Sequence, residues 1–252
     1  MTEPWDHILT TLGYKGAAEL IVTADQIKEC GKTWKGSANQ FEPRLLCYQT
    51  SAALRPATFK KHGLNILPIK NGTYLLCKMN VYQALDYGDV VPVVITQDTS
   101  SVMLGIGGSE TSLIDNMRYS GVFERSEILG EKITHGPLLN GRHRVSLEMR
   151  LGTRDISVAG VQYETDSCFE SAHKILIIEG KSSARPIDSF NIRQLYFPFR
   201  EAMRLAVGKK EVLCLFVHCL GSVIHVWTYT FTDVMRMDSI TLKGHYAYKF
   251  SS

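Results

Sequence analysis

The chain has 252 residues, of which 44% are apolar and 21% are charged, and its formal net charge is +3. These values are typical of a globular protein, because disordered chains are poorer in apolar residues and membrane proteins are much richer. No stretch approaches the roughly 18–20 apolar residues that span a bilayer, and residues 1–7 lack a basic segment, so we expect no membrane span and no signal peptide.

The first part of the chain shows the signals of short helices. Apolar spacing and end signals predict helices over residues 4–12, 24–30 and 56–61. Thr23 is a suitable N-cap for the second of them, and Gly63 ends the third. We expect the six cysteines to be free thiols in a reducing cytoplasm, because no CxxC pair is present.

Strand signals follow these helices. Two apolar runs, 64–69 and 73–78, are separated by Asn71-Gly72, which is a strong hairpin signal. Residues 89–95 form a further predicted strand, and Pro92 places it at the edge of a sheet.

The pattern changes near residue 105. Ser109 or Thr111 can cap a helix that runs to about Phe123. The elements expected after it are strands at 145–151, 156–166 and 174–179, a helix at 188–207 and strands at 212–219 and 223–231. We expect the first three strands to form a meander and the later helix to cross over to a strand of the same sheet, which predicts an α/β fold with a mixed central sheet.

Acidic and basic residues gather at the end of this predicted sheet. Strand side chains alternate between faces, so Glu164 and Asp166 share one face, as do Glu179 and Lys181. Only seven residues separate Asp166 from Lys174, so a hairpin can bring Asp166 close to Glu179.

Two carboxylates held close together repel each other unless a cation lies between them. Oxygen ligands suit Mg²⁺, which binds one or two carboxylates together with water and phosphate oxygens. Such an ion supports phosphodiester hydrolysis, with Lys181 beside the attacking water. The residues alone leave a structural salt bridge equally open.

The pattern Asp166, Glu179-Gly-Lys181 resembles the PD-(D/E)xK nuclease superfamily, and the wider pattern resembles a group of bacterial type II restriction endonucleases. The resemblance covers most of the chain and is strongest over 162–200. The segments that carry it are Gln162–Asp166, Phe169-Glu170, Ile178–Lys181, the run from Asp188 to Arg200, Pro43–Leu45, Leu67-Pro68 and Tyr74.

The resemblance implies a restriction-endonuclease-like αβββαβ core with a mixed central sheet, preceded by a mainly helical N-terminal region. It implies that Asp166 and Glu179 bind Mg²⁺, with the carbonyl of Gly180 as a further ligand, and that Lys181 is the catalytic lysine. One residue departs from the family pattern, because Thr165 stands where the family has proline.

Other acidic and polar residues remain candidates as auxiliaries. Glu164 and Glu170 compete with Asp166, and Gln194 lies where related nucleases place a glutamine near the site. Some relatives recruit an acid from the helix before the sheet, for which both Glu110 and Glu124 remain open.

Basic residues cluster after the motif. Residues 174–210 contain eight Lys/Arg and three Asp/Glu, a local charge of +5, as phosphate contacts require. Helical spacing places Arg193, Phe197, Arg200 and Arg204 in one stripe, which we expect to contact DNA phosphates. A second patch contains Arg142 and Arg144, for which contact with the DNA backbone and a solvated surface are equally open.

We therefore expect residues 1–104 to serve DNA recognition or dimerisation and residues 105–252 to form the catalytic core. The expected function is that of a Mg²⁺-dependent, sequence-specific endonuclease acting on double-stranded DNA in the bacterial cytoplasm. The resemblance also implies a homodimer and a cognate DNA methyltransferase. The alternatives are a repair or RNA nuclease of the same fold, a DNA-binding module without activity, and a structural protein.

Overall fold

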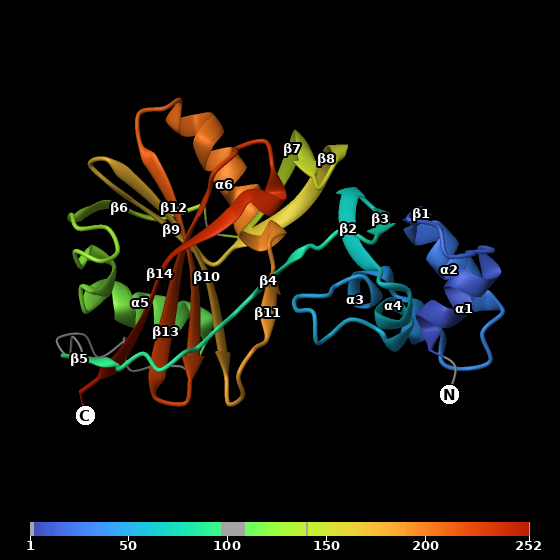
Figure 1. Ribbon diagram of the computed structural model, residues 1–252, viewed down its shortest axis with the longest axis horizontal. Helices are drawn as coiled ribbons and strands as arrows, with labels where there is room; N and C mark the ends of the chain where they lie inside the picture. The colour runs from blue at the N-terminus through green and yellow to red at the C-terminus, as the bar shows by residue number, and fades with distance from the viewer. Residues whose placement is uncertain (1–2, 97–108, 140, 252) are drawn as a thin grey trace.

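The computed structural model describes residues 3–96, 109–139 and 141–251. The chain forms an α/β fold with a seven-stranded sheet, a five-stranded sheet and a small two-stranded sheet. Figure 1 shows the N-terminal elements on one side of the molecule and the large sheet on the other.

Short helices and a hairpin make up the N-terminal part. Their bounds are α1 (Pro4–Thr11), β1 (Glu19–Thr23), α2 (Ala24–Lys32), η1 (Ala38–Phe41), α3 (Pro43–Leu46), α4 (Ala57–His62), β2 (Asn65–Lys70) and β3 (Thr73–Cys77). The three predicted helices and the hairpin are confirmed, and Gly63 ends α4 with a left-handed φ of 67°. These elements share a small core that includes Trp5, Ile8 and Phe59.

The N-terminus of α2 carries a capping box. The Thr23 side chain accepts a hydrogen bond from Gln26 N at 3.2 Å, and Gln26 Oε1 accepts one from Thr23 N at 2.8 Å. We expect Thr23→Ala to lower the free energy of unfolding by about 1 kcal/mol, because one helical N–H loses its acceptor. Urea denaturation measures this change, and Thr10→Ala, an exposed threonine of α1, is the matched control. An equal loss in both variants would contradict the role of the cap.

The seven-stranded sheet has the order β5-β14-β13-β12-β10-β9-β6. Its strands are β5 (Val93–Ile95), β6 (Ile133–Leu138), β9 (Ser167–Ser171), β10 (Lys174–Ser183), β12 (Glu211–Leu220), β13 (Val223–Phe231) and β14 (Ile240–Phe250). The sheet is mixed, because β10 and β12 are parallel while β12 and β13 are antiparallel. The predicted helical crossover between β10 and β12 and the edge position of β5 are both confirmed.

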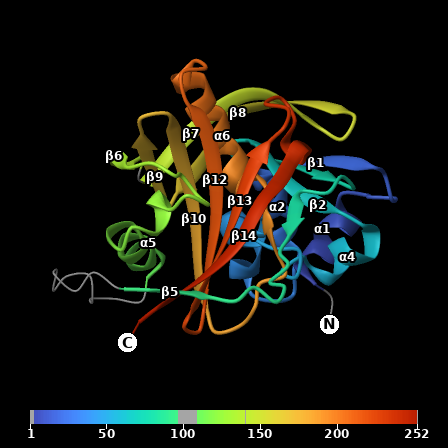
Figure 2. The same ribbon diagram turned by 60° about the vertical axis from the view of Figure 1, so that its left-hand side comes forward.

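Helices cover both faces of this sheet, as Figures 1 and 2 show. On one face, Leu176 and Ile178 of β10 share a core with α5 (Glu110–Tyr119). On the other face, Ile175 and Ile177 share a core with α6 (Arg193–Ala206). Both faces of β10 are therefore buried, which explains its nearly continuous apolar run.

The predicted three-stranded meander is wrong. β7 (Gly141–Leu151) and β8 (Arg154–Thr165) pair with each other and belong to the five-stranded sheet, in the order β1-β3-β2-β8-β7. The unexpected strand β9 is the one that pairs with β10. The β7–β8 hairpin instead covers the outer side of α6, where Leu195 and Phe199 pack in the same core as Val158 and Val161. An amphipathic helix with this much apolar surface has to be covered on that side too.

The predicted helix over 188–207 is also too long. It begins at Arg193, because residues 189–191 form β11 (Ser189–Asn191), which pairs with β4 (Tyr82–Ala84). The remaining short elements are the 3-10 helices η2 (Val122–Glu124) and η3 (Met237–Ser239). All six cysteines are free, and none of the helices within the described ranges is long and apolar enough to cross a membrane.

Candidate active site

The candidate site lies where β10 leaves the buried part of the large sheet. Register pairs Ile178 of β10 with Ser167 of β9, so Asp166, the residue before β9, lies beside Glu179. Glu110 is the first residue of α5, which packs against β10. The sequence expectation that a short connection brings Asp166 to Glu179 therefore agrees with the observed register.

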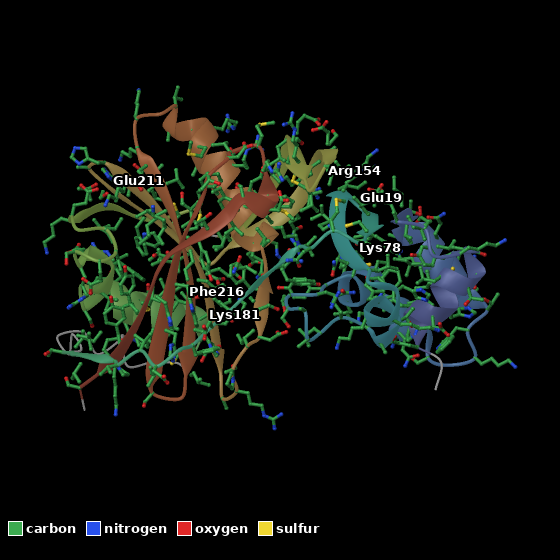
Figure 3. All side chains as sticks on the ribbon, viewed as in Figure 1. Glu19, Lys78, Arg154, Lys181, Glu211 and Phe216 are labelled. Carbon is green, nitrogen blue, oxygen red and sulfur yellow. The ribbon has the colours of Figure 1, made fainter. Side chains whose placement is uncertain are left out.

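The Lys181 ammonium lies among three carboxylates. Its Nζ is 2.8 Å from Glu179 Oε1, 3.3 Å from Glu110 Oε1 and 3.9 Å from Asp166 Oδ2. It also donates a hydrogen bond to the Gly180 carbonyl at 2.6 Å. Figure 3 labels Lys181 near the middle of the molecule, close to Phe216 of the neighbouring strand β12.

Backbone and amide groups hold two of these carboxylates in place. Gly180 N donates to Asp166 Oδ2 at 2.7 Å, and Gln194 Nε2 of α6 donates to Glu179 Oε1. A Cβ at position 180 would lie 3.3 Å from Ile114 Cδ1 and 3.6 Å from Glu110 Cβ. Glycine at this position therefore leaves room for α5 to approach β10.

Burial changes the pKa values of Glu179 and Lys181, the pair at the centre of the cluster. It raises the pKa of Glu179 to about 7; Lys181 opposes this rise, while Asp166 and Glu110 add to it. Burial lowers the pKa of the Lys181 ammonium, but Glu179, Asp166 and Glu110 outweigh it and leave that pKa above its ordinary value. Lys181 is therefore charged at neutral pH, whereas Glu179 keeps its proton to a higher pH than an ordinary glutamate does.

The donor set fits a hard divalent cation by its chemistry. Asp166, Glu179 and the Gly180 carbonyl offer only oxygen atoms, which Mg²⁺ prefers, and Mg²⁺ usually takes only one or two carboxylates and keeps several waters. In the part of the chain that the structure describes, no three His, Cys, Asp or Glu side chains form a metal cage by themselves. With one ammonium among three carboxylates, the cluster keeps an excess of negative charge that a cation would neutralise.

A cavity of about 360 Å³ opens beside the cluster, lined by both Lys181 and Gln194. One wall comes from the N-terminal part of the chain, through Thr50, Ser51 and Leu54. The Asn191 N–H donates to the Thr50 carbonyl at 2.9 Å and joins this wall to β11. A volume in this range suits a group of a small ligand or one unit of a polymer.

The other predicted acids lie outside the cluster. Glu164 is exposed on β8 and pairs with Arg142 at 3.8 Å, and Glu170 pairs with Lys210 at 2.7 Å. Glu124 pairs with Arg118 and Lys132 and accepts a hydrogen bond from Ile133 N. Of the two helix acids that the sequence left open, only Glu110 lies in the cluster.

The predicted arginine stripe is wrong in part, because Phe197 is completely buried. Arg200 donates to Glu148 O and to Tyr196 Oη, both at 2.9 Å, and Arg204 pairs with Glu201. Arg193 is half-buried near Glu179. The second basic patch is on β7, where Arg144 donates to Gly160 O at 2.9 Å.

Sequence reasoning missed the residues that the N-terminal part brings to the site. Tyr48 is exposed, yet its hydroxyl is electrostatically coupled to Glu179, Lys181 and Arg193. No motif marks Tyr48 or the cavity wall at Thr50 and Ser51, because more than a hundred residues separate them from β10 along the chain.

Two family models match the chain. The model described as Domain of unknown function (DUF6997) matches residues 77–249, and the one described as Domain of unknown function (DUF6996) matches residues 4–76. The two matches meet at the end of the β2–β3 hairpin. No curated protein and no solved structure matches the chain.

Proposed function

The chain belongs to the DUF6997 family through residues 77–249, and from its site we propose that it is a Mg²⁺-dependent endonuclease that cleaves double-stranded DNA at specific sequences. The observation that carries the proposal is the Lys181 ammonium, which lies within 3.9 Å of the carboxylates of Glu110, Asp166 and Glu179. These acids come from three separate segments of the chain, and Lys181, which joins them, lines a cavity.

The topology around the cluster supports the proposal. Asp166 comes directly before β9, and Glu179-Gly-Lys181 lies on the next strand, β10. The chain then crosses over through α6 to β12, which is parallel to β10. The same order is expected of the restriction-endonuclease-like core that the sequence resembles. The two hairpin strands β7 and β8 are displaced onto α6, so the likeness rests on α5, β9, β10, α6 and β12.

In this mechanism Asp166, Glu179 and the Gly180 carbonyl would hold Mg²⁺, which, when bound, acidifies a water and neutralises charge on phosphate oxygens. Gln194 holds the Glu179 carboxylate through its amide and fixes its direction. Lys181 stabilises the negative charge that develops on the phosphate as water adds and the P–O3′ bond breaks. The products are a 5′-phosphate and a 3′-hydroxyl, whose oxygen takes up a proton.

Charge near the site supports a polyanionic substrate. Arg193 is half-buried near Glu179. Lys181 and Arg185 both line the cavity. Phosphate binding requires such a concentration of cations, whereas the net charge of +3 over the whole chain is weak.

We expect the protein to cut plasmid DNA into discrete fragments in Mg²⁺ and to leave it intact in EDTA, because the carboxylates need the cation. Gel electrophoresis shows the fragments, and sequencing of their ends identifies the site and the stagger. A smear without preferred ends would favour a repair-type nuclease. Binding of DNA in Mg²⁺ without any cleavage would favour a DNA-binding module, and binding of neither metal nor DNA would favour a structural role.

A further inference from the structure

Several segments next to the candidate active site carry buried polar atoms without partners. Among the described residues, the Gln49 side chain is only 4% exposed and Tyr82 only 5% exposed. Gln49 Nε2 and Oε1, Tyr82 Oη and Gln194 Oε1 lack any hydrogen-bond partner there. Native proteins pair nearly all of their buried polar groups, because a buried donor without an acceptor carries the full penalty of desolvation.

Asn191 joins the backbone segments that carry Gln49, Tyr82 and Arg193. Its Nδ2 donates to the Gln49 carbonyl at 3.3 Å, and its Oδ1 accepts a hydrogen bond from Arg193 N at 3.2 Å. Tyr82 lies opposite Asn191 in the β4–β11 pairing. Gln49, Tyr82 and Arg193 are therefore all direct neighbours of one residue, although they belong to three different segments.

Arg193 supplies a cation at this place. Its guanidinium is half-buried and makes no hydrogen bond or ion pair to any residue within 3–96, 109–139 and 141–251, where only its backbone N–H is bonded. Burial lowers its pKa, while Tyr48, Glu179 and Tyr82 raise it by their charges. A guanidinium held this way is best stabilised by an anion that accepts two parallel N–H bonds, as carboxylate and phosphate do.

We propose that Arg193, Gln49 and Tyr82 form a phosphate-binding subsite next to the cluster of Glu110, Asp166, Glu179 and Lys181. The guanidinium, the Gln49 amide N–H and the Tyr82 hydroxyl are donors, and a phosphate has enough oxygens to accept from all three. Arg193 precedes Gln194, whose amide binds Glu179, so the subsite adjoins the scissile position. We take the natural anion to be the DNA phosphate next to the scissile one, and this identification rests on the proposed function. The binding of free phosphate does not depend on the proposed function.

The experiment is thermal unfolding of the full chain in EDTA and without DNA, with sodium phosphate compared with sodium chloride and sodium acetate at equal ionic strength. Phosphate at about ten times its dissociation constant should raise the melting temperature of the wild type by roughly 3–5 °C. Chloride and acetate should not. Absence of a specific phosphate effect, or equal protection by acetate, would overturn the subsite.

Three variants test the residues. Arg193→Met should abolish the phosphate effect, and Tyr82→Phe and Gln49→Leu should reduce it at least threefold in affinity. Without phosphate, Tyr82→Phe and Gln49→Leu should melt at or above the wild-type temperature, because each removes a buried group that lacks a partner. Arg150→Met, which removes an exposed arginine paired with Asp155, is the control and should keep the full effect.

The outcomes separate this proposal from the proposed function. Unchanged phosphate protection in Tyr82→Phe and Gln49→Leu would assign these residues a structural role only and overturn the subsite. A protein that binds phosphate through Arg193 but never cuts DNA would overturn the nuclease and leave the subsite standing. A protein that cuts DNA but shows no phosphate effect would overturn the subsite and leave the nuclease standing.

Discussion

Lys181→Met is expected to lower the rate of DNA cleavage by on the order of 10²–10³-fold, because the transition state loses a preorganised positive charge. Lys181 is partly buried and held by Glu179 at 2.8 Å, so its ammonium needs little rearrangement to act. Methionine keeps much of the apolar stem and removes the ammonium with its charge and its N–H donors. Single-turnover cleavage of plasmid DNA in Mg²⁺ measures the change.

DNA binding should survive this substitution. We expect Lys181→Met to bind DNA in Ca²⁺ with close to wild-type affinity, because Asp166, Glu179 and the Gly180 carbonyl remain, and fluorescence anisotropy reports it. Lys210→Met removes a lysine that pairs with Glu170 away from the site, so it should cut at the wild-type rate. Should Lys181→Met not fold, Asp166→Asn tests the same cluster. Cleavage at the wild-type rate by both variants would show that the site is wrongly assigned.

Glu179→Gln is expected to change the pH dependence of stability. Folding raises the pKa of Glu179 from 4.5 to about 7, so the folded state holds this proton more tightly than the unfolded state. The associated stability is fully present below pH 4.5 and is lost as the pH rises through 7. At pH 8 the buried charge thus lowers the free energy of unfolding by about 3 kcal/mol, and Glu179→Gln removes this loss.

Urea denaturation at pH 5 and pH 8, in EDTA, measures this effect. The wild type should lose stability between these values relative to Glu179→Gln, and the variant should be the more stable protein at pH 8. Glu164→Gln makes the same change in charge at an exposed position of β8 and should follow the wild type. Parallel pH profiles for wild type and Glu179→Gln would contradict the raised pKa. A bound cation would stabilise the ionised Glu179 carboxylate. The stability lost at high pH without metal is therefore what the proposed metal site would restore.

Local signals were sufficient wherever the structure depends on neighbours in the chain. Thr23 caps α2, Gly63 ends α4 and Asn71-Gly72 turns the β2–β3 hairpin as predicted, because each of these depends on a few consecutive residues. The crossover from β10 through α6 to β12 was also predictable, since a buried apolar strand, an amphipathic helix and a second apolar strand follow in order.

The errors occur where packing partners compete. The apolar pattern of residues 156–166 fits a strand beside β10 as well as one beside β7. The structure uses the second arrangement, because the β7–β8 hairpin has to cover α6. Phe197 was placed on the polar stripe of α6 for the same reason: helical spacing identifies one apolar face, but this helix is covered on more than one side.

The sequence by itself determined the chemistry available at the end of β10, namely Glu179, Gly180 and Lys181, and the nearness of Asp166, because only seven residues connect it to β10. The tertiary structure decided the rest. It placed Glu110, and not Glu124, in the cluster. It left Arg193 half-buried within electrostatic range of Glu179 and Tyr82. It also brought Gln49 and the cavity wall at Thr50 next to β11, which is far away in the chain. These outcomes depend on how separate elements pack, and a linear pattern of residue types does not encode which distant side chain fills a given space.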